Sequence, residues 1–157
     1  MRPVEPAPLW VSPVLYVEDE TPNWEVVELR LGKRFKLQWA RSSEEACDRI
    51  RAQKGEYLAI LMDIQLSGSA LDGVALTRAL RGKTDQASLP AFARGLPKID
   101  CPLFFVTAYG DLYPPNELTA AGGDGWMPKP VDFLKLMMLL SRASVTRTLE
   151  TLKPPGP

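Results

Sequence analysis

The sequence predicts an α/β protein in which helices cover both faces of one parallel β-sheet. Two observations support this fold class. Short apolar runs alternate with amphipathic stretches of helical length, as in repeated strand–helix units. One run, 57–62 (YLAILM), consists of six apolar or aromatic residues, which is typical of a central strand buried on both faces. The 157 residues fit a single domain of ordinary composition, with 45% hydrophobic and 24% charged residues.

Five strands and five helices are expected in alternation. Thr21 is a candidate N-cap for the first helix, with Pro22 at its first position. Ser42 and Glu45 form a capping box for the second helix, and Gly55 is a stop signal. The strands are expected at 13–20, 35–40, 57–62, 102–110 and 124–130, and the helices at 21–35, 41–55, 71–82, 114–123 and 131–150.

The expected domain spans 13–150, between a proline-rich extension at 1–12 and a tail at 151–157. Inside it, the connection at about 82–101 is much longer than the few residues that usually join a helix to a strand. This connection is a tolerated surface insertion, or else a partner-docking loop or an extra short helix.

The last helix carries more apolar residues than one buried stripe needs. Phe133, Met137 and Leu140 can face the core, whereas Leu134 and Met138 lie on a different face. The extra apolar surface is either covered by the N-terminal segment around residue 10 or used as a partner surface.

Composition excludes several classes of function. The formal net charge is zero, so no basic surface for nucleic acid or an anionic membrane is expected. The chain has no histidine, which excludes histidine-based catalysis and histidine-ligated zinc. Cys47 and Cys101 form no metal-binding pattern, and without an export signal we expect them to be reduced thiols in the cytoplasm.

Polar side chains follow the apolar parts of four predicted strands. In such sheets the functional site lies at the carboxyl ends of the strands. Taken singly, each residue fits an ordinary turn, cap or loop; together they indicate one site. The residues are Glu18 and Asp19 after the first strand, Asp63 after the third, Thr107 in the fourth and Lys129 after the fifth.

Three converging carboxylates repel one another unless a cation compensates their charge. Mg²⁺ (or Mn²⁺) suits this role because it prefers oxygen ligands. Lys129 adds a positive charge and Thr107 adds a hydroxyl donor, so the group could hold a phosphoryl group on a carboxylate.

The chain resembles the receiver domains of two-component response regulators over about 13–145. The resemblance implies a flavodoxin-like sheet with strand order 2-1-3-4-5. The intervals from Asp19 to Asp63 and from Thr107 to Lys129 agree with receiver spacing. The matching motifs are VLYVEDE, AILMDIQLSG, LDG, FFVTAYG and GGDGWMPKP.

The resemblance implies a role for each site residue. Asp63 would accept the phosphoryl group, and Thr107 and Lys129 would contact it. The expected Mg²⁺ ligands are Asp19, Asp63, the backbone carbonyl of Gln65 and, through water, Glu18. Trp126 would be the switch aromatic, and the Lys129–Pro130 bond would be cis. Two features depart from the usual pattern: Ser67 stands where receivers usually have proline, and the segment 67–73 is about two residues longer.

We therefore expect a stand-alone response regulator in signal transduction. Its phosphoryl donor would be a sensor histidine kinase or phosphotransfer protein, since the chain has no histidine. Its output would be an unknown protein target or a homodimer through helix 4, strand 5 and helix 5, with no nucleic acid or membrane partner. It would be no turnover enzyme, catalysing only its own phosphorylation and dephosphorylation. The alternative is a pseudo-receiver, a phosphorylation-independent interaction module. A related phosphatase is disfavoured because it needs an aspartate at the position of Gln65.

Overall fold

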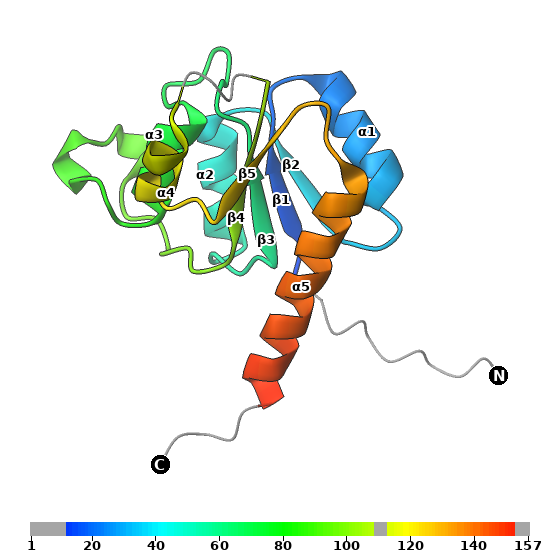
Figure 1. Ribbon diagram of the computed structural model, residues 1–157. Coiled ribbons are helices and arrows are strands. Elements are labelled where there is room, and N and C mark those ends of the chain that lie inside the picture. The colour runs from blue at the N-terminus through cyan, green and yellow to red at the C-terminus, as the bar shows by residue number, and fades with distance from the viewer. Residues whose placement is uncertain (1–11, 109–112, 153–157) are drawn as a thin grey trace.

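A single parallel sheet forms the centre of the molecule (Figure 1). The computed structural model describes residues 12–108 and 113–152. The strand order is β2-β1-β3-β4-β5 and every neighbouring pair is parallel, which confirms the predicted fold class and order. The strands are β1 (Val14–Val17), β2 (Leu37–Ala40), β3 (Ala59–Met62), β4 (Leu103–Thr107) and β5 (Gly125–Pro128).

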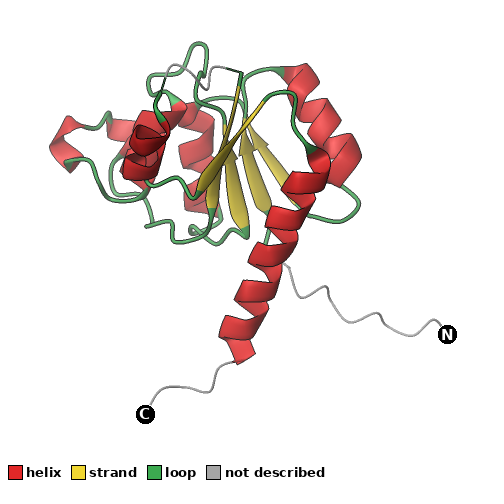
Figure 2. Cartoon of the chain, viewed as in Figure 1, coloured by secondary structure: helices red, strands yellow, loops and turns green. Residues whose placement is uncertain are grey.

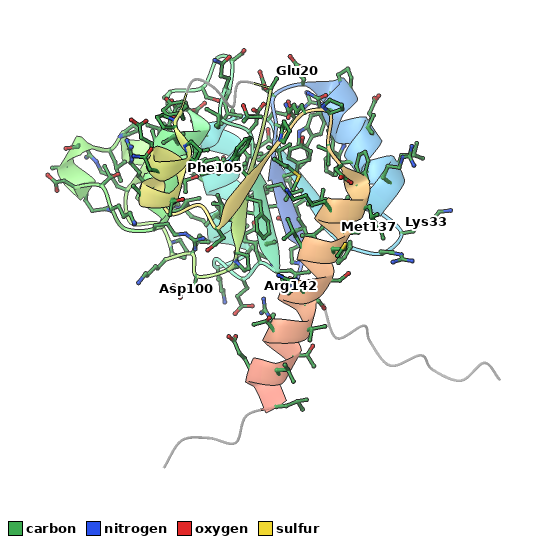
Figure 3. All side chains as sticks on the ribbon, viewed as in Figure 1. Glu20, Lys33, Asp100, Phe105, Met137 and Arg142 are labelled. Carbon is green, nitrogen blue, oxygen red and sulfur yellow. The ribbon has the colours of Figure 1, made fainter. Side chains whose placement is uncertain are left out.

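Helices cover both faces of this sheet (Figure 2). Alternate side chains of β1, β3 and β4 enter two separate apolar cores, because successive residues of a strand face opposite sides. Figure 3 labels Phe105, which belongs to the core on the side of α2, α3 and α4, and Met137, which packs against the core on the side of α1 and α5. The helices are α1 (Thr21–Leu31), α2 (Ser43–Ala52), α3 (Gly73–Leu80), α4 (Pro115–Ala121) and α5 (Phe133–Leu152).

The two predicted helix starts have different outcomes. Ser42 caps α2 as expected, since its Oγ accepts a hydrogen bond from the Glu45 N–H at 3.1 Å. The prediction for α1 was wrong by one residue. Glu20 occupies the cap position with extended backbone and no side-chain cap bond, and Thr21 is already helical. Pro22 still lies in the first turn, where its missing N–H costs nothing.

The long connection between α3 and β4 is folded against the domain. It contains two short 3₁₀ helices, Gln86–Ser88 and Ala91–Ala93, so the expectation of an extra short helix is confirmed in this form. Leu89, Ala93 and Ile99 are buried in the core next to α2 and α3. The connection is therefore part of the packed core as well as a surface feature.

The buried stripe of α5 differs from the predicted one. Leu136, Leu140 and Ala143 are the buried positions, and Phe133 and Met137 only pack against the edge of this core. Apolar side chains remain exposed along the outer face of the helix. They are Leu134, Met138, Val145, Leu149 and Leu152.

Several predictions fall on parts of the chain that the structure does not describe. The extension at 1–12, except Ser12, and the tail beyond 152 lie outside the described residues, as does the proposed cover around residue 10. In the described ranges, no helix has the length and apolar character needed to cross a membrane.

Candidate functional site

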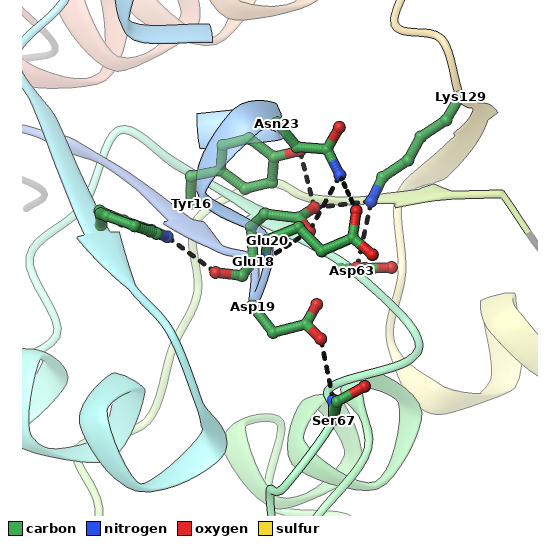
Figure 4. Close-up of polar contacts among 9 residues, drawn as sticks. Tyr16, Glu18, Asp19, Glu20, Asn23, Asp63, Ser67 and Lys129 are labelled. Carbon is green, nitrogen blue, oxygen red and sulfur yellow. Dashed lines mark hydrogen bonds and ion pairs between the residues drawn. The ribbon is translucent and has the colours of Figure 1, made fainter. Parts of the chain in front are cut away.

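Three carboxylates meet where β1 and β3 end (Figure 4). The two strands pair in parallel with Val17 opposite Met62, so the residues that follow them emerge side by side. One carboxylate oxygen from each of Glu18, Asp19 and Asp63 lies within 4.8 Å of the others. The structure thus brings together the three acids that the sequence placed at separate strand ends.

Lys129, the residue after β5, joins this cluster. Its Nζ lies 2.6 Å from Glu18 Oε2 and 3.1 Å from Asp63 Oδ2. The Lys129–Pro130 bond is cis, as the resemblance implied. One lysine cation therefore bridges two of the three carboxylates and offsets part of their repulsion.

Glu18 is completely buried, and donors surround both of its oxygens. Oε1 accepts from the Glu20 N–H at 3.1 Å and from Asn23 Nδ2 at 3.2 Å. Oε2 accepts from the Tyr16 hydroxyl at 3.1 Å and from Lys129. A buried carboxylate with these partners is satisfied within the protein. Because both of its oxygens already accept hydrogen bonds, Glu18 is less available as a direct metal ligand than the other two acids.

Tyr16 and Asn23 were missed by the sequence reasoning. Burial and the negative charge of Glu18 raise the pKa of Tyr16 well above its usual value, so the phenol stays protonated and donates. A signal was available, because residues two apart on a strand share a face, and Tyr16 precedes Glu18 by two. Asn23 lies in the first turn of α1 and had no comparable signal.

Asp63 sits at the centre of the group and is 4% exposed. Burial, and next the charge of Glu18, raise its pKa to about 7, while Lys129 acts in the opposite direction. Its backbone is fixed as well. The Asp63 N–H donates to the Val17 carbonyl at 3.0 Å, and a Cβ on Gly73 would lie 1.9 Å from the Asp63 carbonyl oxygen. Gly73 is therefore required for α3 to start so close to the site.

The unusual segment after Asp63 is attached to its surroundings. The Ser67 N–H donates to Asp19 Oδ2 at 3.1 Å. Further along, the Ser43 N–H donates to Ser69 Oγ at 3.1 Å, and the Ala70 N–H donates to Glu44 Oε1 at 3.0 Å. The start of α2 thus anchors the longer segment beside the site.

The remaining predicted residues lie around this group. Thr107 ends β4, is fully buried, and accepts a backbone hydrogen bond from the Lys129 N–H at 3.0 Å. Trp126 lies in β5 with 39% of its surface exposed. Gln65 follows Asp63 with its side chain exposed. Their individual roles remain predictions.

The donor set fits a hard divalent cation. It consists of carboxylate oxygens, which Mg²⁺ and Mn²⁺ prefer, and it is too acidic for Lys129 alone to neutralise. Asp19 and Asp63 each have one engaged oxygen, since Asp19 Oδ2 accepts from Ser67 and Asp63 Oδ2 accepts from Lys129, and no donor among the described residues contacts either Oδ1. Asp19 and Asp63 are the residues best placed to hold such an ion.

Several solved structures that match the fold of this chain are receiver domains. The receiver domain of the sensor histidine kinase PA1611 from Pseudomonas aeruginosa is 25% identical, with a TM-score of 0.66 over 85% of this chain and 98% of that chain. That structure has a magnesium ion coordinated in its active-site cleft. The receiver domain of a putative Luxo repressor protein from Vibrio parahaemolyticus is 18% identical, with a TM-score of 0.71 over 92% and 98%.

The similarity covers a receiver domain and not a longer regulator. NtrX from Brucella abortus is 19% identical with a TM-score of 0.67, but the chain covers only 29% of that protein. No protein-family model and no curated protein matched the sequence. The comparisons therefore establish that the chain has the fold of response-regulator receiver domains.

Proposed function

From the receiver-domain fold that the chain shares with these structures, we propose that it is a response regulator whose Asp63 accepts a phosphoryl group. One observation carries the proposal. Asp63 lies at the end of a central strand, in contact with Lys129 and within 4.8 Å of carboxylate oxygens of Glu18 and Asp19. This is an arrangement that can hold a phosphoryl group through charge neutralisation and positioning.

The proposed reaction is a displacement at phosphorus. A carboxylate oxygen of Asp63 forms the new P–O bond as the P–N bond of a phosphohistidine breaks. The electron pair returns to the donor imidazole. The donor histidine must come from another protein, because the chain contains none. Asp63 must be ionised to attack, which its raised pKa opposes when no cation is bound.

Other residues of the chain would stabilise the product. Lys129 already contacts Asp63 and would neutralise a phosphoryl oxygen. The Thr107 hydroxyl would donate to the same group from the adjacent strand. Asp19, Asp63 and the Gln65 carbonyl would hold Mg²⁺, with Glu18 acting through water. A bound Mg²⁺ would supply charge neutralisation for the phosphoryl oxygens and keep Asp63 ionised.

A small phosphodonor tests this proposal directly. The protein is incubated with Mg²⁺ and acetyl phosphate, and its intact mass is measured. We expect one added phosphoryl group in the wild type and none in Asp63→Asn. If the wild type forms no adduct and binds no beryllium fluoride, the chain acts instead as a pseudo-receiver, a phosphorylation-independent interaction module.

Partners follow from the same proposal. A sensor histidine kinase or phosphotransfer protein would supply the phosphoryl group, and a downstream protein would read the changed surface. We propose that this surface is formed by α4, β5 and α5, with Trp126 as the switch aromatic. Trp126, Leu134 and Met138 already expose apolar area there.

A homodimer through this surface is a specific version of the proposal. Size-exclusion chromatography with and without beryllium fluoride distinguishes it from binding to a different protein. A shift to the dimer on addition of beryllium fluoride, lost in Met138→Glu, is the expected result. If the protein stays a monomer under both conditions, the homodimer is contradicted and the surface can only bind a different protein.

A further inference from the structure

Two N–H donors from segments that are distant in the sequence contact the Glu18 carbonyl, which precedes Asp19, and the Asp19 carboxylate. On one side lies Trp39 of β2, and on the other lies Ser67 of the segment after β3. Neither residue belongs to the acidic cluster itself. Both contacts lie next to or on Asp19, whose carboxylate has an oxygen without a donor among the described residues.

Trp39 acts on the backbone. Its indole Nε1–H donates to the Glu18 carbonyl oxygen at 2.7 Å. That oxygen shares a rigid peptide plane with the nitrogen and Cα of Asp19. A bond that fixes the carbonyl therefore also fixes the point from which the Asp19 side chain leaves the backbone.

The indole of Trp39 is itself clamped between two side chains. Trp24 of α1 stacks on it with ring centroids 5.3 Å apart and an interplanar angle of 7°. The Arg41 guanidinium lies over the Trp39 ring, 4.3 Å from its centroid. Such stacking and cation–π contacts limit rotation of the ring. The Trp39 N–H is thus presented to Glu18 in a fixed direction.

Ser67 acts on the other end of the same residue. Its backbone N–H donates to Asp19 Oδ2, which orients the carboxylate plane. The same bond also fixes the direction of Oδ1, because both oxygens lie in the carboxylate plane. No donor among the described residues contacts Oδ1. The segment that carries Ser67 is in turn tied to α2 through Ser69 and Ala70.

We propose that Trp39 and Ser67 are positioning residues that set the affinity of the site for a divalent cation. The inference rests on the proposed function, in which Asp19 binds that cation. Repulsion from Glu18 and Asp63 favours an Asp19 side chain turned out to solvent. The two N–H donors hold it in place before the cation arrives, so the cation does not have to order it.

The indole contact has a matched pair of variants. Trp39→Phe removes the N–H and keeps an aromatic ring in the stack, whereas Trp24→Phe changes the stack and keeps the N–H. Binding of Mn²⁺ is followed by electron paramagnetic resonance, and Mg²⁺ by calorimetry. We expect the dissociation constant to rise roughly tenfold in Trp39→Phe and to change less than about twofold in Trp24→Phe.

The Ser67 contact has a second pair. Ser67→Pro removes the backbone N–H, and Ser67→Ala keeps it. We expect weaker cation binding only in Ser67→Pro, with the melting temperature in chelator recorded for each variant. This pair tests the positioning of Asp19 even if Trp39→Phe does not fold, because Ser67 contacts the carboxylate of Asp19 and Trp39 contacts the backbone before it.

The outcomes separate this inference from the proposed function. If the wild type binds neither Mn²⁺ nor Mg²⁺, both the positioning role and the proposed function are contradicted. A wild type that binds, with Trp39→Phe and Ser67→Pro binding equally well or more tightly, removes only the positioning role. Equal weakening in Trp39→Phe and Trp24→Phe assigns the effect to the stack and also overturns the proposed role of the N–H.

Discussion

Lys129 and Glu18 form an ion pair of 2.6 Å in which the carboxylate is completely buried. The lysine side chain is 16% exposed, so water screens the pair only weakly. A buried ion pair is costly to break from one side, because the remaining charge has no partner. This relationship makes Lys129 a structural residue as well as a candidate phosphate contact.

Lys129→Met is therefore expected to destabilise the fold by about 2–4 kcal/mol, measured by urea unfolding at pH 8 without divalent cations. The Tyr16 and Asn23 donors would limit the loss. The double variant Lys129→Met/Glu18→Gln, which removes both charges, should recover part of the lost stability. No recovery would mean that the loss comes from packing of the lysine stem.

Asp63 should make stability depend on pH when no cation is present. Its pKa is raised to about 7 in the folded protein, so the folded state binds the proton more tightly than the unfolded state. Its contribution is complete below pH of about 4 and is lost as pH rises toward 7. Asp63→Asn has no proton to lose.

The measurement compares the free energy of unfolding of wild type and Asp63→Asn from pH 5 to pH 8. As pH rises from 5, we expect the free energy of unfolding of Asp63→Asn to increase relative to that of the wild type, by about 2 kcal/mol or more at pH 8. Asp124→Asn, at a carboxylate remote from the site, serves as the control. A wild-type–variant difference that stays constant with pH would contradict the raised pKa.

A divalent cation should stabilise the protein by neutralising the acidic cluster. At Mg²⁺ concentrations a hundredfold above the dissociation constant, the expected gain is about 2.7 kcal/mol. Chelation with EDTA should reverse the rise in melting temperature. Asp19→Asn should abolish most of the gain, while Glu56→Gln, away from the cluster, should keep it.

Gly73 should be essential for the position of Asp63. A Cβ at this residue would lie 1.9 Å from the Asp63 carbonyl oxygen, which no backbone can accept without moving. Gly73→Ala is expected to lower both stability and the rate of phosphorylation by acetyl phosphate. Gly125→Ala is the matched control, because its Cβ would meet only Phe104 at 3.4 Å, an ordinary contact. Equal behaviour of the two variants would contradict the close approach.

The long connection before β4 should contribute to stability. Ile99 is fully buried, so Ile99→Ala is expected to cost about 2–4 kcal/mol in unfolding free energy. Lys98→Ala, at the adjacent exposed position, should be nearly neutral. If both substitutions are neutral in thermal unfolding, the segment is a dispensable insertion.

Sequence patterns could identify the strands and most helix signals because these depend on neighbours along the chain. The apolar run at 57–62 contains β3 with its buried positions, and the Ser42 cap was read from residues three apart. The stripe of α5 was assigned less well. Several of its faces are apolar, and only packing against the sheet selects Leu136 and Leu140 as buried.

The strand ends were also readable from the sequence, and with them the candidates Glu18, Asp19, Asp63, Thr107 and Lys129. What a one-dimensional pattern cannot supply is the set of contacts between distant segments. Lys129 reaches across 111 positions to Glu18, and Ser67 reaches across 48 to Asp19. Such distances carry no periodic signal.

The sequence by itself determined the fold class and the residue types at the carboxyl ends of the strands, because local apolar patterning and strand-end chemistry are properties of short segments. Only the tertiary structure decided how those residues are held. The burial of Glu18 among four donors, the raised pKa of Asp63 and the two N–H contacts around Asp19 arise when separate strands and loops are packed together. Burial and charge proximity are three-dimensional quantities, and they set the electrostatics of this site.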